Sequence, residues 1–506
     1  MSLAESKAWQ KITGPLLVFL GVGLLLYGRT LFNDFSADDF RALYRAGVQG
    51  KIFVNGFYRP LSDLSIFITY KIAGANPFLF HLTNLIVHTA NGVLVYILFS
   101  KFQILFTKQP PSIGLSWFAG LLFICFPFHN EGVVWIVGRG ASFATLFALV
   151  ALIIVLSSLS FVKRSVLAGF AFFVGLQAYE SIIILPFIIL IVARLRGDSL
   201  KQLAVWFVIS LLVIVLYFFG RLQFAGSVTG EYRLDLWQAE IKNYFLNFFK
   251  ALGRLIVSPS DSSALMSLLV AGLTGLYLVN RFLARKKNDT GSILAENSLL
   301  AIILITLLIP AYFPVSTRTS EGDRLLYFPS VFFCCFLAFF ITRLTINGTL
   351  RLIVVGVLGL YYVYSLETNN KNWIIASAKG KEFLNTFQGL RQQGQRVYIC
   401  NVPGEFRGAY IFRNVLEDVL LVRNIDTVAV TAVNYLNNAE QKSLPGTIFP
   451  VLRNDSVIFS PSAKLWNRQL TGYNFDVPDQ PPVVYDLNEK DQVWYWDNQS
   501  LRKFSR

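Results

Sequence analysis

The stretch NDFSADDF (33–40) places three carboxylates just after an apolar run, roughly 14–32, that is long enough to cross a bilayer. Two of them, Asp38 and Asp39, are adjacent. Neighbouring carboxylates raise one another's proton affinity, which moves one of them toward the range of a useful general base. The same pair could hold a divalent cation. Asp38 and Asp39 are therefore the first candidates for catalysis.

Other ionisable residues fall in loops that the positive-inside rule places on the same side of the membrane. They include Arg59, Asp63, His129, Glu131, Arg139, Glu180, Arg221, Glu231, Arg233, Arg318, Glu321, Asp323 and Arg324. Taken alone, each has an ordinary explanation as a solvated or anchoring charge at a helix end. Their concentration on one face favours a function, because ionisable groups at the membrane boundary are costly and tend to mark substrate paths.

The elements that position these residues belong to a chain that is 54% hydrophobic and 15% charged over 506 residues, which is too apolar for a soluble enzyme. We expect a polytopic α-helical membrane protein, because a helix satisfies its own backbone in lipid. About eleven apolar runs approach the length of a membrane span. They lie roughly at 14–32, 78–100, 112–128, 141–162, 165–179, 181–193, 203–220, 262–280, 298–313, 330–341 and 351–366.

Basic residues occupy alternate loops between these runs, so the N-terminus is expected in the cytoplasm and the first loop outside. An odd number of spans places the hydrophilic tail outside as well. We predict a transmembrane domain at 1–366 and a small extracytoplasmic α/β domain at 367–506. The net charge of +15 follows mostly from this topology and gives no reason to expect a nucleic-acid partner.

The tail has the pattern of a small mixed domain. RVYICNV (396–402) and TVAVTAV (427–433) have the β-branched character of strands. Between them, 410–422 spaces its apolar residues at helical intervals.

The first outer loop, 33–77, is long for a simple connection. Its apolar residues recur at helix-like intervals, which indicates short amphipathic helices along the outer membrane surface. Such helices would hold Asp38 and Asp39 beside Arg59, at the level of the lipid phosphates.

The second apolar run carries a polar stripe. His81, Asn84, His88 and Asn91 are spaced so that they share one face of a helix. One explanation is that they form hydrogen bonds to neighbouring helices. The other is that His81, which is nearest the outer surface, lines the floor of a cavity.

Blocks along the first 330 residues resemble GT-C fold glycosyltransferases, in order. They are SADDFRAL, YRPLSDLSIFITYKIAGANPFLFHLTNLIVHTANGVLVY (58–96), FPFHNEGVVWIVGRGASFATLFALVAL (126–152), AYESIIILPFIIL (178–190) and EGDRLLYFPSV (321–331). The resemblance is to bacterial relatives of the transmembrane-and-TPR protein O-mannosyltransferases, although the chain has no 34-residue helical repeat. The segment NVPGEFRGAYIFRN (401–414) resembles part of the tails of bacterial members.

This resemblance implies a GT-C-like bundle in the bacterial inner membrane that binds an isoprenoid-phosphate-linked sugar in a cavity at the outer face. It also implies that acidic residues of the first outer loop lie at the reaction centre, here Asp38, the first choice, and Asp39. Arg324 matches an arginine expected near the donor phosphate. The matching HNE and GR positions imply His129, Glu131 and Arg139 as cavity residues. His81, Glu180 and Asp323 are further candidates for the cavity.

The chemistry of such a donor suits the residue types. A polyprenyl-phosphate sugar already has a good leaving group, so the protein needs cations for the developing phosphate charge and a carboxylate for the proton of the acceptor hydroxyl. Arg59, Arg139 and Arg324 are candidates for the first task. Proton abstraction by Asp38 would invert the anomeric centre.

A divalent cation bound by Asp38, Asp39 and Glu131 would do comparable work by fixing the phosphate. No phosphate-cradling glycine loop occurs on the inner side, so a lipid-linked donor is expected. The acceptor is a protein, a glycolipid or a glycan. Two other functions stay open, which are a non-catalytic GT-C-like scaffold or accessory subunit in envelope assembly and a transporter of lipid-linked saccharides.

Overall fold

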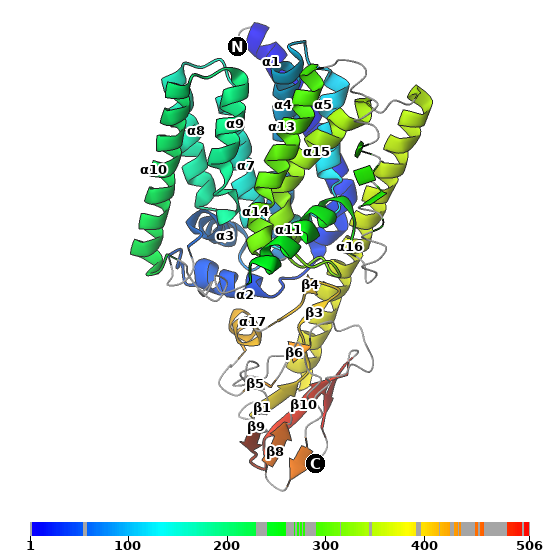
Figure 1. Cartoon of the computed structure of the whole chain (residues 1–506). Helices are drawn as coiled ribbons and strands as arrows, with labels where there is room; N and C mark the ends of the chain where they lie inside the picture. Colours follow the sequence, from blue (N-terminus) through cyan, green and yellow to red (C-terminus); the bar gives the residue numbers. More distant parts are fainter. Residues whose placement is uncertain are drawn as a thin grey trace. The chain divides into compact units, whose positions relative to one another are not determined.

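The structure is a computed structural model of the 506-residue chain (Figure 1). It describes residues 3–504 apart from gaps at 54–57, 229–239, most of 260–289, 314, 344–346, 391–395, 414, 426–429, 434, 437–450, 454–455, 460–482 and 498–499.

The chain divides into two compact units, each built from separate segments. The first unit comprises Met1–Leu31, Lys51–Ser65 and Leu79–Asn369. The second comprises Phe32–Gly50, Ile66–Phe78 and Asn370–Arg506. Parts of the first outer loop therefore belong to the same unit as the tail.

The first unit is helical. Its main helices are α1 (Leu3–Tyr27), α4 (Pro77–Thr107), α5 (Ile113–Ile124), α6 (Asn130–Val133), α7 (Arg139–Val155), α8 (Phe161–Leu176), α9 (Leu185–Arg196), α10 (Leu200–Ala225), α11 (Ile241–Ile256), α13 (Thr290–Thr306), α14 (Leu308–Tyr312) and α15 (Tyr327–Arg343). Short 3-10 turns are η1 (Gly28–Phe32), η3 (Glu180–Ile182) and η5 (Asp323–Leu326). Helices α3 (Pro60–Ala73) and α16 (Gly348–Leu390) contribute residues to both units.

Six helical segments of the described chain are long and apolar enough to cross a membrane. They are Ile12–Phe32, Pro77–Thr107, Leu200–Ala225, Leu294–Tyr312, Asp323–Thr342 and Gly348–Gln388. The protein is thus a polytopic helical membrane protein, as predicted.

Four of the eleven predicted runs form shorter helices, and one run is not described. The runs from 112 to 193 correspond to α5, α7, α8 and α9, which have 12 to 17 residues. Turns with proline, serine or glycine, as at Pro127, Ser157 and Gly197, end these helices before they reach 18 residues. The run at 262–280 lies largely outside the described residues.

Local signals set the connections between the packed helices of the first unit. α7 packs on α8, α10 packs on α8 and α9, and α15 packs on α13, α5 and α7 (Figure 1). At the end of α9, Gly197 adopts the left-handed conformation, with φ of 103°, that stops a helix. Ser199 and Gln202 then form a capping box that starts α10.

The second unit contains helices of the first outer loop and the strands of the tail. Helix α2 (Asp38–Ala42) continues into a π-helical turn, η2 (Leu43–Val48), and α17 (Leu416–Val422) packs on both. Helices were predicted in this loop, and α2, η2 and α3 are found there.

The tail forms a small mixed sheet, as predicted. Its strand order is β11-β10-β1-β5, in which β1 is parallel to β10 and β5, and β10 is antiparallel to β11. Tyr398, Cys400 and Val493 are buried in its core. The strands are β1 (Val397–Cys400), β5 (Val430–Ala432), β10 (Gln492–Trp496) and β11 (Leu501–Lys503). A separate antiparallel sheet has the order β7 (Val451–Arg453), β8 (Ser456–Phe459) and β9 (Val483–Asp486).

The helix expected at 410–422 begins later, at Leu416. The residues before it form a hairpin of β3 (Glu405–Phe406) and β4 (Ala409–Tyr410). Arg407 and Gly408 both have positive φ, at 49° and 85°, as the tight turn of a two-residue hairpin requires. Tyr410 therefore belongs to a strand and not to the predicted helix. Strands β2 (Val402–Pro403) and β6 (Tyr435–Leu436) pair in parallel nearby.

Candidate functional site

The two adjacent carboxylates of the first outer loop have different surroundings within the second unit. Asp39 is buried, and its Oδ2 accepts hydrogen bonds from the Ser36 amide at 3.0 Å and from the Ser36 hydroxyl at 3.3 Å. Asp38, the first residue of α2, is only half-buried. Asp39 thus fixes the turn that precedes α2, whereas Asp38 is the more accessible carboxylate of the pair.

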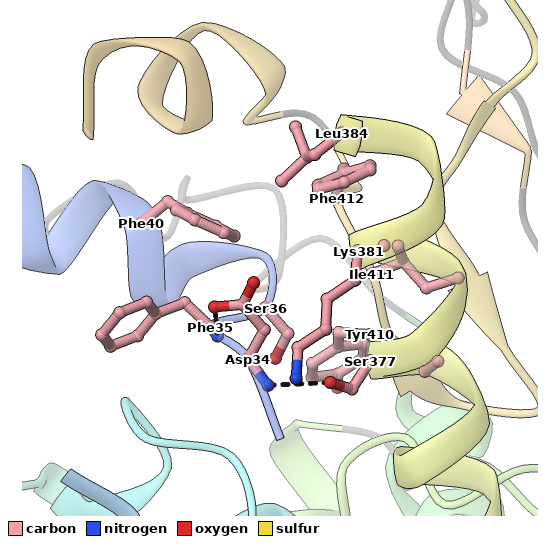
Figure 2. Close-up of a pocket in the computed structure, with 12 residues that line it drawn as sticks. Asp34, Phe35, Ser36, Phe40, Ser377, Lys381, Leu384, Tyr410, Ile411 and Phe412 are labelled. Carbon is pink, nitrogen blue, oxygen red and sulfur yellow. Dashed lines mark hydrogen bonds between the residues drawn. The ribbon is translucent and has the colours of Figure 1, made fainter. Parts of the chain in front are cut away.

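The third carboxylate of the cluster, Asp34, is held by the C-terminal part of the same unit. Arg423 donates from Nη2 to Asp34 Oδ2 at 2.6 Å, and the Asp34 amide donates to Ser377 Oγ at 2.7 Å. Figure 2 shows Asp34 in a small pocket with Lys381 and Tyr410. Sequence reasoning missed Arg423, because nothing in the sequence separates it from the other basic residues of the tail.

Two motifs that are far apart in the sequence meet at Glu131 in the first unit. The Glu131 side chain is fully buried, and it accepts from the Gly322 amide at 3.1 Å and from the Arg324 amide at 2.9 Å. Arg324 Nη1 lies 3.2 Å from both Glu131 oxygens, and the guanidinium also lies over the Trp135 ring. Charge-assisted hydrogen bonds of this kind compensate for the burial of a carboxylate. Arg324 is 28% exposed and is the solvent-facing member of the pair.

The neighbouring Asp323 forms a second buried ion pair, with a residue that sequence reasoning missed. Arg254 Nη2 donates to Asp323 Oδ1 at 2.6 Å, and neither side chain is exposed. Arg254 also donates to the carbonyls of Ser316 and Val257 and lies over the ring of Phe128. Asp323 and Arg254 therefore form a rigid support beside the Glu131–Arg324 pair.

His129 is buried directly before Glu131. Its Nε2 lies 2.7 Å from Ser330 Oγ, and that hydroxyl donates to the Tyr327 carbonyl at 2.7 Å. Because the hydroxyl has one proton, His129 Nε2 must be the donor to Ser330. Burial lowers the pKa of His129, and the nearby His88 lowers it further, so the ring is neutral at neutral pH. His129 acts here as a buried hydrogen-bond donor.

Glu180 joins two arginines. Arg59 Nε donates to its Oε2 at 3.2 Å and Arg221 Nη1 donates to its Oε1 at 3.0 Å. Arg59 also lies over the Tyr179 ring at 4.5 Å. Burial raises the pKa of the Glu180 carboxyl, but the two guanidinium groups together lower it by more, so this pKa lies below its ordinary value. Glu180, Arg59 and Arg221 together carry one net positive charge.

Glu180 gives a pH-dependent prediction. Its lowered folded-state pKa means that ionised Glu180 stabilises the fold. This contribution is complete above the unfolded-state pKa of about 4.3 and is lost as pH falls through the lower folded-state pKa. We expect Glu180→Gln to lower the free energy of unfolding at neutral pH, and the difference from wild type to shrink toward pH 3. Chemical unfolding in detergent across this pH range measures it.

The matched control for this prediction is Glu382→Gln, because Glu382 is an exposed glutamate on α16. Its unfolding curve is expected to follow that of wild type more closely at every pH. A Glu180→Gln deficit that is independent of pH would contradict the prediction.

Arg139 is fully buried at the start of α7, where its guanidinium serves the backbone. It donates to the carbonyls of Ile136 and Phe80 at 3.1 and 2.9 Å, and to the hydroxyl of Ser65 at 3.2 Å. These contacts tie the α7 start to α3 and α4.

The polar stripe on α4 makes hydrogen bonds to neighbouring segments. Asn84 donates to the carbonyls of Val133 and Trp135, and His88 and Asn91 both contact the Tyr327 hydroxyl. His81 is buried as well.

The predicted cation site combines Asp38 and Asp39 of the second unit with Glu131 of the first unit. No group of three or more histidine, cysteine, aspartate or glutamate side chains suited to a metal ion occurs among the described residues. Both Glu131 oxygens already accept from N–H donors. A cation at Glu131 would have to displace one of these donors.

Two solved structures align with the chain at low similarity. The crystal structure of ArnT from Cupriavidus metallidurans bound to undecaprenyl phosphate has 12% identity and a TM-score of 0.47, covering 83% of this chain and 90% of that one. The archaeal oligosaccharyltransferase AglB from Archaeoglobus fulgidus, in complex with an inhibitory peptide and a dolichol-phosphate, has 11% identity and a TM-score of 0.42, covering 78% and 62%.

Curated relatives show a higher sequence identity, over a shorter stretch of the chain. No family model matches the chain. Mouse protein O-mannosyl-transferase TMTC2 is 36% identical over 157 residues, which is 27% of this chain and 18% of that protein. Human protein O-mannosyl-transferase TMTC1 is 31% identical over 158 residues, which is 27% of this chain and 17% of that protein. The chain spans about a fifth of the length of these relatives. The resemblance seen in the motifs is thus confirmed, as a distant homology to protein O-mannosyl-transferases over 27% of the chain.

Proposed function

We propose that the protein is a GT-C glycosyltransferase that moves a sugar from a polyprenyl-phosphate-linked donor to an acceptor at the outer face of the membrane. The observation that carries this proposal is the similarity to protein O-mannosyl-transferases at 36% identity over 157 residues. The meeting of the 129–131 and 322–324 motifs in one buried cluster supports it, because both motifs belong to the resemblance. The acceptor class is a protein, a glycolipid or a glycan.

In the proposed reaction, the acceptor hydroxyl oxygen attacks the anomeric carbon as the bond from that carbon to the phosphate oxygen breaks. The hydroxyl proton passes to the Asp38 carboxylate, and polyprenyl phosphate leaves. Attack opposite the leaving group inverts the anomeric centre. Asp38 is preferred over Asp39 because it is half-buried, whereas the Asp39 oxygen is engaged with Ser36.

Among the candidate phosphate-binding arginines, accessibility favours Arg324 and Arg59. Arg324 is 28% exposed and Arg59 is 14% exposed. Arg139 has no exposed surface and is already bound to carbonyls. We therefore assign Arg139 to positioning the start of α7, and Arg324 and Arg59 to the developing phosphate charge.

The proposal is tested with membranes that contain the protein, radiolabelled polyprenyl-phosphate sugars and an acceptor extract. Transfer of label that depends on the protein is the expected result. A donor that is bound but never consumed would favour a scaffold instead.

We also propose eleven crossings of a bacterial inner membrane, with the N-terminus in the cytoplasm and a domain at 367–506 outside. The positive-inside pattern of the loops supports this topology.

The topology predicts which exposed lysines can be labelled. In a variant that lacks the four native cysteines, Lys490→Cys is expected to react with a membrane-impermeant maleimide on spheroplasts, and Lys163→Cys only after the membrane is opened. Both side chains are exposed, so accessibility within the protein is matched. Labelling of Lys163→Cys on sealed spheroplasts would contradict the topology.

A further inference from the structure

The segment that carries the proposed base belongs to the same compact unit as the tail. Residues 33–42 of the first outer loop contact two tail elements, which are the hairpin segment 401–413 and the end of α17 near Arg423. The hairpin segment lies within NVPGEFRGAYIFRN (401–414), a segment of the tail that the sequence alone singles out. The proposed chemistry assigns no task to it.

The backbone directly before Asp38 is strained. Ala37 has φ of 45° and ψ of −124°, a region that side chains with a Cβ rarely adopt. Such a conformation persists only where the surroundings determine it. Here the Ala37 amide donates to the Ile411 carbonyl at 2.7 Å.

The Ile411 carbonyl is itself fixed by the hairpin. The Ile411 amide donates to the Gly404 carbonyl at 2.8 Å, and the Phe412 amide donates to the Pro403 carbonyl at 3.1 Å. The position of the Ile411 carbonyl is therefore set by the hydrogen bonds of the β3–β4 hairpin.

Ion pairs hold the loop on both sides of Asp38. Arg423 Nη2 lies 2.6 Å from Asp34 Oδ2, and Arg41 Nε lies 3.1 Å from Asp418 Oδ2. Asp34 Oδ1 in turn accepts from the Phe35 amide at 2.9 Å. The carboxylate of Asp34 thus connects the tail to the backbone of the loop.

The pocket beside this contact is too small for a ligand site. It has a cavity volume of about 10 Å³, and Phe40, Phe412 and Leu384 line it (Figure 2). Pockets that bind small molecules have about 300 to 1,000 Å³. A role in positioning the loop explains the contact better than a role in binding.

We propose that the hairpin 401–413 and Arg423 form a loop clamp that positions Asp38 for proton abstraction, so that the tail is part of the catalytic machinery. Arg423 is a positioning residue that acts through Asp34, and the Ile411 carbonyl acts through Ala37. This inference rests on the proposed function, since it assumes that Asp38 is the base.

The test compares Arg423→Met, Arg423→Lys and the control Arg396→Met in full-length protein in nanodiscs. Arg396 pairs with Asp491 at 2.7 Å in the sheet of the same unit, so its loss removes a comparable ion pair. Displacing a reacting group by about 1 Å costs about 10²-fold in rate. We expect Arg423→Met to lower kcat by about that factor with an unchanged KM for the donor.

Arg423→Lys is expected to keep most of the activity, because the contact with Asp34 uses one nitrogen. Arg396→Met is expected to keep wild-type kcat and to unfold at a midpoint similar to that of Arg423→Met. Amide hydrogen exchange of residues 33–42 is expected to accelerate in Arg423→Met and not in Arg396→Met.

The outcomes separate this inference from the proposed function. If wild type transfers sugar but Arg423→Met keeps its kcat, or exchange of 33–42 is unchanged, the clamp is wrong and the proposed function stands. If wild type transfers no sugar, the proposed function fails, and hydrogen exchange alone decides whether Arg423 holds the loop.

Discussion

Replacing Asp38 by asparagine is expected to reduce sugar transfer by about 10³-fold, within the 10² to 10⁴ that general base catalysis contributes. The substitution keeps the size of the side chain and removes its ability to take the acceptor proton. Because Asp38 is half-buried at the start of α2, the fold is expected to tolerate asparagine there. Initial rates with a radiolabelled polyprenyl-phosphate donor, at matched protein levels, measure the effect.

Asp39→Asn is the matched control for Asp38→Asn, one residue away in the same helix. The Asp39 oxygen accepts from the Ser36 amide and hydroxyl, and an asparagine carbonyl can still accept from both. Its loss of activity is expected to be much smaller. Equal losses in the two variants would show that the carboxylates act as a pair, and no loss in either would remove Asp38 from the reaction.

The largest effect on stability is expected at the Arg254–Asp323 pair. Removing one partner of a fully buried ion pair leaves an uncompensated charge, which costs about 3 to 5 kcal/mol. Asp323→Ala would leave the Arg254 guanidinium without its carboxylate in a site with no exposure. The free energy of unfolding, measured by chemical denaturation in detergent, is expected to fall by that amount.

Two comparisons sharpen the stability prediction. The double variant Arg254→Met with Asp323→Asn is expected to recover part of the loss, because it buries no unpaired charge. Arg29→Met disrupts the exposed Arg29–Glu367 pair and is expected to cost less than about 1 kcal/mol. If Asp323→Ala and Arg29→Met had equal effects, the buried pair would not be a structural support.

Much of the architecture follows from the sequence, because hydropathy and loop charge are local properties. Six long apolar helices, the helices of the first loop and the mixed sheet of the tail are present in the described chain. The predicted helix start at 410 was wrong by six residues, because Tyr410 ends the β3–β4 hairpin and Arg413 has a positive φ of 45°, so the helix begins only at Leu416.

The sequence indicated which residue types belong to the candidate site, but it did not indicate which of these residues pair with one another. Glu131 and Arg324 were both expected near the site, but their ion pair joins loops that are separated by seven α-helices of the described chain, α7 to α11, α13 and α14. Arg254 lies on α11, which alternates apolar and polar residues and so falls outside a search for continuous apolar runs. A search for amphipathic helices over 241–256 would have found that helix. No local pattern identifies the pairing of Arg423 with Asp34.

The pairing of Glu131 with Arg324 has a consequence for how the protein is made. The two residues are 193 positions apart, so a ribosome that adds about 5 to 20 residues per second finishes the second about 10 to 40 seconds after the first. During that interval Arg324 has not yet been synthesised, so Glu131 lacks this partner and must stay hydrated at the membrane surface. We therefore expect the contact between the Glu131 and Arg324 loops to form late, after the helix that follows Arg324 has been inserted. Truncated nascent chains that end before residue 322 are expected to remain sensitive to proteases at the Glu131 loop.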